Sequence, residues 1–482
     1  MQTDYKKSLY IDGKWFEGTS TIANINPSDI SDKIGDFAQA SVAQVEQAIQ
    51  AANVAQPLWE ATPLEKKVNI LQAIGDELIQ RSEELGTLLA REEGKTKAEG
   101  KGEIYRAGQF FQYYSAEVLR QIGENARSVR PGVEIEITRE AIGVVGIISP
   151  WNFPTATAVW KIAPALCYGN AVIWKPANVT PASAVELAKI IDKHDLPNGT
   201  FNLILGSGRS AGEALINSKN ISALSFTGSV EVGRGIAKAT AANFVKCQLE
   251  MGSKNALVIA DDADIETAIT CTIGGSFGGT GQKCTASARL VVFEGIYDKY
   301  LSALKEKLKT LKVGHALEEG NFMGPVVDEK QLQSNLKWVQ RGKDLGATLV
   351  FGGKQLKLEK EGYYMEPTLF TDTKNEWDIN QEEVFAPLAC IIKVKNLCEA
   401  IKTVNDTRFG LTAGIVTKSL EYSAKFKKAV KSGCVMVNLP TAGTDYHVPF
   451  GGRKESSFGP REQGSYAKEF YTVVKTAYQK PY

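Results

Sequence analysis

Cys284 follows a glycine-rich stretch, residues 278–283, and precedes an apolar run, residues 289–293, that is typical of a buried strand. A thiol reacts only when it is accessible and when its pKa is low enough to yield a thiolate. The glycines leave room around the sulfur, and the neighbouring Lys283 could stabilise the thiolate. This context favours Cys284 as a covalent nucleophile, whereas small buried side chains are the default expectation for the other six cysteines.

Two further residues lie where they could assist a nucleophile. Glu250 follows an alternating run, residues 244–249, and a buried glutamate at a strand end can act as a general base. Asn152 lies between two prolines after an apolar run, residues 144–149, and its amide could donate to an oxyanion. Ordinary alternatives remain for both, namely a surface glutamate in a turn and a solvated amide in a rigid turn.

The elements that must position these residues alternate between strand and helix. Helical spacing dominates residues 42–121, including the segment 64–90. Five apolar runs then predict buried strands at residues 144–149, 171–174, 201–205, 223–226 and 256–259, with helices between them at residues 182–193, 210–218 and 230–241. This βαβ alternation predicts a doubly wound parallel sheet, and a second α/β stretch covers residues 265–437.

Two glycine-containing turns follow strands of the predicted sheet and open helices, at residues 206–212 and 226–233. The N-terminus of a helix presents backbone N–H groups and a positive dipole end to a phosphate. Neither turn has the G-x-G-x-x-G spacing, so an ordinary strand–helix turn remains the alternative for each. Lys175 follows another predicted strand and could contact a nucleotide, although a solvated surface lysine is the commoner case.

The composition limits the class of protein. The chain has 482 residues, which predicts two or three domains, and a formal net charge of +1, which gives no indication of nucleic acid or a membrane surface. Residues 1–10 do not resemble a signal peptide, and the longest apolar run, residues 141–148, is too short to span a membrane. We therefore expect a cytoplasmic protein. The cysteines and the three histidines are scattered, so we expect no metal site and no disulfide framework.

Two segments do not fit the βαβ pattern. Residues 133–139 alternate with period two, as a half-exposed strand does, and the tail at residues 466–482 alternates weakly. An exposed edge strand is usually covered, so a subunit partner is plausible.

Taken together, the motifs resemble the aldehyde dehydrogenase superfamily over nearly the whole chain. The matching segments, in order, are residues 150–154, 175–176, 226–229, 249–252, 281–284, 382–387, 437–438 and 449–452. The resemblance implies an NAD(P)-binding domain at residues 1–122 and 143–250 and a catalytic domain at residues 251–445. It also implies a bridging element, residues 123–142 and 446–482, that joins subunits into a dimer or a homotetramer.

The resemblance implies a role for each matching residue. Cys284 would attack an aldehyde, Asn152 would stabilise the oxyanion, Glu250 would activate water and Lys161 would relay a proton. Trp160 would line the substrate pocket, with Lys283 and Arg453 as candidates to hold a substrate carboxylate. NAD or NADP would be bound by Ser149, Trp151, Lys175, Asn178, Gly208, Gly212, Phe226, Gly228, Ser229, Glu383 and Phe385.

Departures from the family pattern refine these expectations. Asn178 stands where NAD-preferring members often place a glutamate, so repulsion of a 2′-phosphate is removed and NADP should be accepted. Ser253 and Ala386 replace glycines, and we expect little effect from either. Ser457 also replaces a glycine, in a region expected to line the bridging element more than the chemistry.

Residues 438–452 resemble 2-oxoglutarate semialdehyde (2,5-dioxopentanoate) dehydrogenases, which predicts 2-oxoglutarate as the product. A succinate semialdehyde or general aliphatic aldehyde dehydrogenase is the alternative within the same chemistry. A CoA-acylating relative, a catalytically silent nucleotide-binding protein and a Cys–His acyl transferase are further alternatives. Glu250 argues for water over CoA, and the intact set of Cys284, Glu250 and Asn152 argues against a silent protein.

Overall fold

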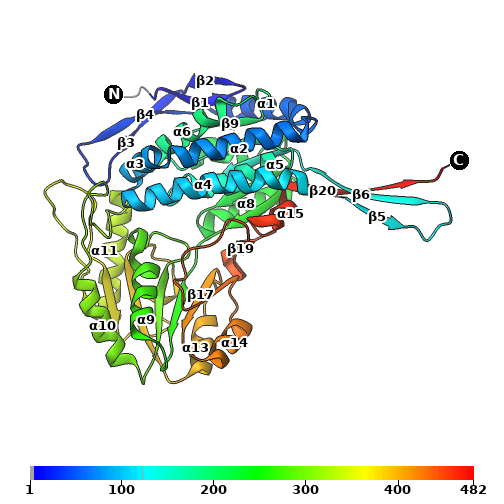
Figure 1. Cartoon of the computed structure of the whole chain (residues 1–482). Helices are drawn as coiled ribbons and strands as arrows, with labels where there is room; N and C mark the ends of the chain where they lie inside the picture. Colours follow the sequence, from blue (N-terminus) through cyan, green and yellow to red (C-terminus); the bar gives the residue numbers. More distant parts are fainter. Residues whose placement is uncertain (1–4, 122, 482) are drawn as a thin grey trace.

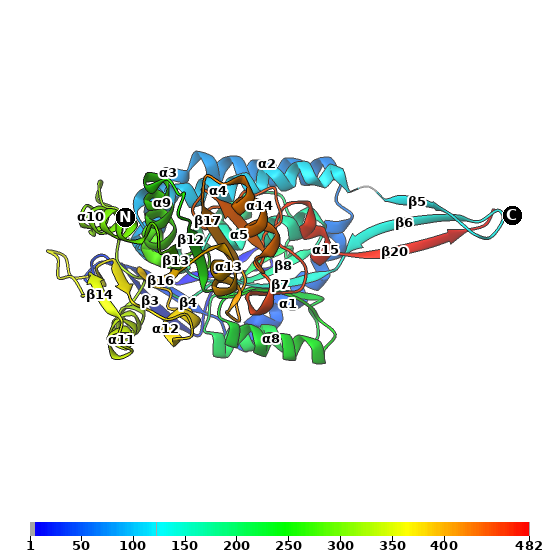
Figure 2. The same ribbon diagram turned by 90° about the horizontal axis from the view of Figure 1, so that it is seen from below.

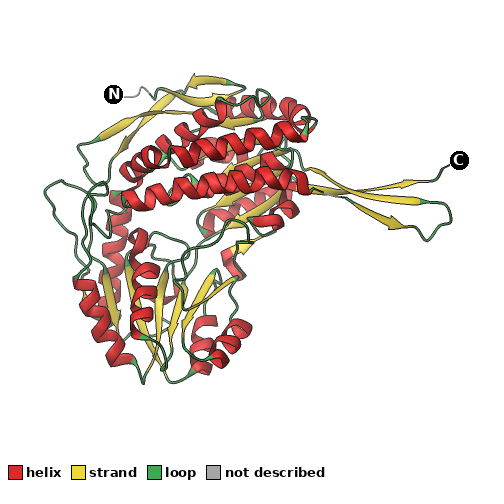
Figure 3. Cartoon of the chain, in the orientation of Figure 1, coloured by secondary structure: helices red, strands yellow, loops and turns green. Residues whose placement is uncertain are grey.

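The computed structural model describes residues 5–121 and 123–481, which form two α/β lobes and a projecting arm (Figure 1). The first lobe contains an eight-stranded sheet, the second a seven-stranded sheet and the arm a three-stranded sheet. A separate hairpin consists of β3 (Ser20–Ile25) and β4 (Lys33–Gln39). Helices flank the two large sheets (Figure 3), and the predicted doubly wound fold with a second α/β domain and a small β element is confirmed.

The first sheet has a parallel centre and antiparallel edges. Its strands are, in order, β19 (Ser457–Phe458), β11 (Lys246–Glu250), β10 (Ala223–Thr227), β7 (Val144–Ile148), β8 (Ala171–Lys175), β9 (Phe201–Leu203), β1 (Lys7–Ile11) and β2 (Lys14–Glu17). The five strands from β11 to β9 run parallel, so their carboxyl ends share one edge of the sheet. Side chains at strand ends, which the sequence marked as candidates, therefore meet on one side.

Helices cover both faces of this sheet. They are α1 (Val42–Glu60), α2 (Leu64–Gln80), α3 (Ser82–Glu93), α4 (Lys97–Glu117), α5 (Ala156–Cys167), α6 (Pro181–Asp192), α7 (Glu213–Ile216) and α8 (Val230–Ala242). From below, α1 and α8 lie on one side of β7 and β8, and α2 and α4 lie on the other (Figure 2). The helical segment 64–90 is divided at Arg81, which leaves the helical conformation at ψ 14° and bonds to Glu77 and Glu84. The helix expected at residues 210–218 is reduced to a π-turn, Gly208–Gly212, followed by the short α7.

The second sheet contains the last of the five strands predicted from the sequence, residues 256–259. Its order is β14 (Thr348–Phe351), β15 (Thr368–Thr371), β16 (Leu388–Val394), β13 (Ser287–Phe293), β12 (Asn255–Ile259), β17 (Thr412–Val416) and β18 (Cys434–Val437). The expectation that residues 256–259 continue the first βαβ series is wrong, because the chain leaves the first sheet at Glu250 and enters the second at Asn255. Helices of this lobe are α9 (Ile265–Thr272), α10 (Tyr297–Lys309), α11 (Glu329–Asp344), α12 (Asp378–Gln381), α13 (Leu397–Asn405) and α14 (Leu420–Ala429).

The arm combines two segments that are distant in the sequence. β6 (Glu134–Ala141) pairs antiparallel with β5 (Glu124–Arg127) and with β20 (Thr472–Gln479), and the three strands extend away from the lobes (Figures 1 and 2). Seven of the eight residues of β20 are exposed. The tail becomes a strand only at Thr472, because α15 (Lys468–Tyr471) precedes it. Within the described ranges, each helix is too short or too polar to cross a bilayer.

Candidate active site

A cavity of about 240 Å³ lies between the two lobes, at the carboxyl edge of the first sheet. Its position follows from the topology, because loops after β7, β10 and β11 approach the loop that precedes β13. Both lobes therefore supply its walls. The sequence-predicted residues that line it are Trp151, Asn152, Trp160, Gly228, Ser229, Glu250, Cys284, Glu383 and Phe385.

The loop that carries Cys284 has an unusual backbone. Gly279, Thr280 and Gly281 have positive φ angles of 60°, 55° and 65°. A Cβ atom on Gly281 would lie 2.1 Å from the Ala386 carbonyl oxygen, so only glycine fits there. Asn255 fixes the backbone at the nucleophile, because its side-chain amide donates a hydrogen bond to the Cys284 backbone carbonyl at 2.7 Å.

The environment of the sulfur favours the neutral thiol. Burial raises the pKa of the Cys284 thiol well above its usual range, and the carboxylates of Glu383 and Glu250 raise it further. Lys283 does not line the cavity; its ammonium group donates to the Gly274 carbonyl at 2.8 Å. Burial lowers the pKa of Lys283 to about 8. The thiolate must therefore form by transfer of a proton to a base.

The backbone at Asn152 is held by a buried ion pair that the sequence motifs did not indicate. The side-chain amide of Asn152 donates to the Gln282 carbonyl at 2.9 Å, beside Cys284, and the backbone carbonyl of Asn152 accepts from Lys95 at 2.6 Å. Lys95 is paired with Glu103 at 2.7 Å, and the second Glu103 oxygen accepts from the backbone N–H groups of Thr155 and Ala156. Lys95 and Glu103 are 4% and 1% exposed, which makes this pair part of the core.

Glu250 lies at the end of β11, opposite Ser457 of β19 in the sheet register. The Ser457 hydroxyl accepts from the Gly452 N–H and donates to the Glu250 carboxylate, both at 2.5 Å. The expectation that Ser457 lines the bridging element is wrong, because β19 pairs with the first sheet beside Glu250. Burial and the nearby Glu462 raise the pKa of Glu250 to about 8, whereas the Ser457 hydrogen bond lowers it.

Lys161 and Glu462 form a second buried pair behind this carboxylate. Their charged groups are in direct contact, with 0% and 1% of the side chains exposed, and Lys161 also donates to Ser225 at 3.0 Å. Lys161 was a candidate from the sequence, but Glu462 was not. The two lie 301 residues apart, so no local pattern could join them.

Lys175 is buried rather than solvated. Its ammonium group donates to the carbonyls of Pro176 and Gly206 at 2.8 and 3.0 Å, and burial lowers its pKa to about 8. Within the described part of the chain no carboxylate pairs with it. A buried cation that lacks a counter-charge fits an anionic or hydroxyl-rich ligand. Gly212 lies beside it, because a Cβ there would be 3.6 Å from Lys175 Cε.

The remaining residues predicted to bind the cofactor lie in or near two turns at the carboxyl edge of the first sheet. Ser229 caps α8, and Gly228 lies against Phe226, where a Cβ would come within 2.5 Å of the ring. Gly208 opens the Gly208–Gly212 turn and is exposed. Farther along the same edge, Asn178 donates to Gln39 at 3.2 Å, and Ser149 accepts from Trp174 at 2.9 Å.

Glu383 faces this group from the second lobe. Its carboxylate accepts from the Ser253 N–H at 2.8 Å, and burial raises its pKa to about 7. A Cβ on Gly252 would lie 2.1 Å from the carboxylate, so the glycine permits the approach. Phe385, at φ 58°, meets Trp151 edge to face with ring centroids 5.4 Å apart.

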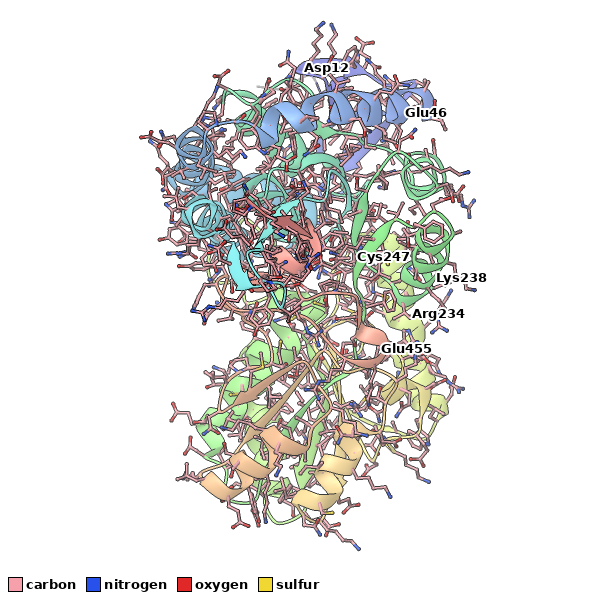
Figure 4. All side chains as sticks on the ribbon, turned by 90° about the vertical axis from the view of Figure 1, so that its right-hand side faces the viewer. Asp12, Glu46, Arg234, Lys238, Cys247 and Glu455 are labelled. Carbon is pink, nitrogen blue, oxygen red and sulfur yellow. The ribbon has the colours of Figure 1, made fainter. Side chains whose placement is uncertain are left out.

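Trp160 forms the opposite wall, with its ring 5.5 Å from that of Phe450. Arg453 is exposed and does not line the cavity. Glu455 bonds to Arg234 of α8 at 3.1 Å (Figure 4) and to Arg408 of the second lobe at 2.7 Å, which links the lobes.

Comparisons with known proteins agree with this geometry. A model of the aldehyde dehydrogenase family matches residues 15–477. The chain is 39% identical to an alpha-ketoglutaric semialdehyde dehydrogenase of Bacillus subtilis, over 98% of both chains. It is 37% identical to a 2,5-dioxopentanoate dehydrogenase of Saccharolobus solfataricus, over 97% of this chain and 98% of that one.

Solved structures give the same result. A betaine aldehyde dehydrogenase of Staphylococcus aureus in complex with NAD+ superposes with a TM-score of 0.96 at 32% identity, over 98% of this chain and 95% of that one. An NADP-dependent enzyme of E. coli superposes with a TM-score of 0.95 at 32% identity, over 99% and 98% of the two chains.

Proposed function

Since the chain belongs to the aldehyde dehydrogenase family, we propose that it oxidises an aldehyde to a carboxylic acid with NAD+ or NADP+, through a covalent intermediate on Cys284. One observation carries this proposal: a single cavity is lined by a thiol, a carboxylate and an amide donor, namely Cys284, Glu250 and Asn152. These three groups are the nucleophile, base and oxyanion donor that acyl chemistry on a thiol requires.

The first step is attack by sulfur on the aldehyde carbon. Because the thiol is neutral, Glu250 takes its proton as the S–C bond forms. The carbonyl oxygen becomes the oxyanion of a thiohemiacetal, which receives hydrogen bonds from the Asn152 amide and the Cys284 backbone N–H. The aldehyde hydrogen can leave the thiohemiacetal as hydride because the oxyanion re-forms a C=O bond and a thioester results, a route that the free aldehyde lacks.

The second step is hydrolysis of the resulting thioester. Glu250 first releases to solvent the proton it took from the thiol. It then removes a proton from water, the water oxygen adds to the carbonyl carbon, and the C–S bond breaks, so that Cys284 leaves as the thiolate and the acid is released. Lys161 and Glu462 are assigned to positioning and charge balance, because the Glu462 carboxylate raises the pKa of Glu250 and Lys161 neutralises Glu462. Hydrolysis should therefore accelerate as the pH rises towards about 8, the pKa of Glu250.

The residues along the carboxyl edge fit a nicotinamide dinucleotide. The buried Lys175 and the N-terminus of α8 at Ser229 offer cationic and N–H donors to ribose and phosphate, and Glu383 offers an acceptor to the other ribose. When bound, the oxidised nicotinamide supplies a hydride acceptor, which the side chains of the chain cannot provide. Asn178 carries no charge to repel a 2′-phosphate, so both NAD+ and NADP+ should bind.

The substrate proposed is 2-oxoglutarate semialdehyde. The names of the relatives from Bacillus subtilis and Saccharolobus solfataricus, aligned over nearly the whole chain, support it. The cavity wall of Trp160, Phe153 and Phe450 suits the carbon chain of an aldehyde. Aliphatic aldehydes and succinate semialdehyde remain the alternatives.

The experiment follows the absorbance of reduced nicotinamide with purified protein, each aldehyde, and NAD+ or NADP+ in parallel. Wild type should reduce the cofactor, Cys284→Ala should not, and Glu250→Gln, which lacks the base of both steps, should reduce it far more slowly than wild type. Preference for pentanal over both semialdehydes would overturn the substrate proposal and keep the reaction. Product formed only when CoA is added would overturn hydrolysis by Glu250.

The proposal extends to the domains and the assembly. We assign cofactor binding to residues 1–122 and 143–250, catalysis to residues 251–445, and subunit contact to residues 123–142 and 446–482, with the exception of β19, which pairs with the first sheet. The exposed Val473, Val474 and Tyr478 on β20, an edge strand, support a dimer or tetramer built through the arm. We place the enzyme in the cytoplasm.

A further inference from the structure

Arg106, on α4, carries a positive charge that no side chain in the described part of the chain neutralises. It is half-buried, and among the described residues its guanidinium group has neither an ion-pair partner nor a hydrogen-bond acceptor. Its guanidinium group lies against the ring of Tyr446, with the guanidinium carbon 5.4 Å from the ring centroid. The buried Lys95, by contrast, has a partner in Glu103.

A row of aromatic side chains connects this arginine to the cavity. Trp160 lines the cavity, its ring lies 6.1 Å from Phe110, and Phe110 lies 6.2 Å from Tyr446. Phe110 is one helical turn after Arg106, so the two side chains share a face of α4. The arginine therefore stands at the outer end of the aromatic wall whose inner end borders the nucleophile.

The contact with Tyr446 holds the guanidinium group without using its N–H donors. A ring attracts the flat face of the cation, while the five N–H donors point outward in its plane. A planar fork of this kind matches the two oxygens of a carboxylate. A carboxylate is also the ligand that a partly desolvated, unpaired cation binds most strongly.

The geometry points to Arg106 as the residue that binds the carboxylate of the aldehyde substrate, at the end opposite the reacting carbonyl. This inference rests on the proposed function, because it needs an aldehyde at Cys284. The class of substrate is then an aldehyde with a carboxylate at the far end of a short carbon chain. Lys283 and Arg453, the candidates from the sequence, do not line the cavity, and neither does Arg106. Lys283 is bonded to the Gly274 carbonyl and Arg453 is exposed, whereas Arg106 is half-buried and contacts the aromatic row that leads to Trp160.

The test compares two aldehydes of equal chain length, 2-oxoglutarate semialdehyde and pentanal, in wild type, Arg106→Gln and Arg106→Lys. The readout is the ratio of their kcat/KM values. Loss of a charge-assisted hydrogen-bonding pair should lower this ratio by about 10- to 100-fold in Arg106→Gln, mainly through KM. Arg106→Lys keeps the charge but loses the planar pair of N–H donors. Its kcat/KM ratio should therefore lie between those of Arg106→Gln and wild type.

Lys101→Gln is the matched control, because it removes one exposed positive charge from the same helix. Its ratio should equal that of wild type. Equal losses on both aldehydes in Arg106→Gln would overturn the inference and leave Arg106 a structural role. A wild-type ratio in Arg106→Gln, or a fall in Arg453→Gln instead, would also overturn it.

The proposed function fails in a different way. If wild type oxidises none of the aldehydes, or if Cys284→Ala is as active as wild type, the covalent chemistry itself is wrong. If wild type is active, depends on Cys284 and retains its ratio when Arg106 is replaced, only the role of Arg106 is wrong.

Discussion

At the residue scale, the hydroxyl of Ser457 controls how readily Glu250 ionises. It donates to the carboxylate at 2.5 Å and so favours the charged form. Replacing Ser457 with alanine or glycine should raise the pKa of Glu250 further above about 8. Since the ionised form is the base, the rise of thioester hydrolysis with pH should move upward by about one pH unit. The measurement is the rate of acyl-enzyme breakdown after rapid mixing, from pH 6 to pH 10.

Ser456 offers the control for this prediction. Its hydroxyl donates to the Gly252 carbonyl at 2.9 Å and does not contact Glu250. Ser456→Ala should keep the wild-type midpoint, and Ser457→Thr should restore it by restoring the hydroxyl. A midpoint in Ser457→Ala that matches wild type would show that the hydrogen bond does not tune the base.

The pair of Lys95 and Glu103 gives a prediction about stability and rate together. Lys95→Met leaves Glu103 buried without its partner, which should lower the free energy of unfolding by about 3–5 kcal/mol. It also removes the donor to the Asn152 carbonyl, so kcat should fall more than KM changes. Denaturant unfolding and steady-state kinetics measure the two effects.

Lys97→Met is the comparison, because its partner Glu83 is exposed and such pairs contribute about 0–1 kcal/mol. If both variants lose the same small amount of stability, Lys95 and Glu103 do not act as a buried pair. A stable Lys95→Met with wild-type kcat would likewise separate the pair from the oxyanion donor.

Some residues of the site could be predicted from the sequence around them, and others could not. Cys284, Glu250 and Asn152 could be predicted because each stands beside a strand end within a few residues of a glycine or proline. Glu462, Lys95 and Ser457 could not, because their partners lie 301, 57 and 207 residues away in the sequence. Their roles depend on contacts that only the folded sheets create.

At the scale of elements, the turn before the nucleophile depends on Gly281. Gly281→Ala must accept a positive φ and also a contact 2.1 Å from the Ala386 carbonyl. The φ alone costs about 1–2 kcal/mol, and the contact should add about 1–3 kcal/mol and displace Cys284. Thermal or denaturant unfolding, with thiol labelling of Cys284, measures the outcome.

Gly320→Ala isolates the backbone cost, because Gly320 has φ 83° and no atom within 4 Å of the added Cβ. Gly320→Ala should therefore lose only the smaller amount of stability, that due to the positive φ. Equal losses in the two variants would mean that the loop moves to relieve the contact with Ala386.

The elements themselves followed the hydrophobic pattern closely. Strands β7, β8 and β10 lie within one residue of the apolar runs that predicted them, because fully buried parallel strands are apolar throughout. The division at Arg81 was missed because apolar spacing continues across it. The backbone leaves the helical conformation at Arg81 alone, at φ −93° and ψ 14°, and α3 begins at the next residue, so no glycine or proline marks the break in the sequence.

At the scale of the whole molecule, the arm supplies a prediction about assembly. Val474→Asp with Tyr478→Asp places charges on the exposed side of β20. If subunits meet there, the mass measured by light scattering should fall to that of a smaller oligomer. The control is Val129→Asp, in the turn between β5 and β6, where the side chain is fully exposed. An unchanged mass in the double variant would place the subunit contact elsewhere.

The family could be predicted from the order of eight short motifs, and the family model and the relatives confirm it. The orientation of the two lobes relative to each other could not be predicted from the sequence. The cavity depends on how Glu383 and the Cys284 loop of one lobe face Glu250 of the other, and the sequence contains no local signal for that orientation.

The first lobe is not completed by its own stretch of the chain, and this matters while the protein is being synthesised. Its edge strand β11 is covered only by β19, and Asn170 is satisfied by the Tyr471 carbonyl at 3.0 Å. Until those residues leave the ribosome, the nascent chain holds an unpaired strand edge next to the strand end that carries Glu250. The enzyme therefore gains its base position and its protection against aggregation together, only after the segment that contains β19 and Tyr471 has been synthesised.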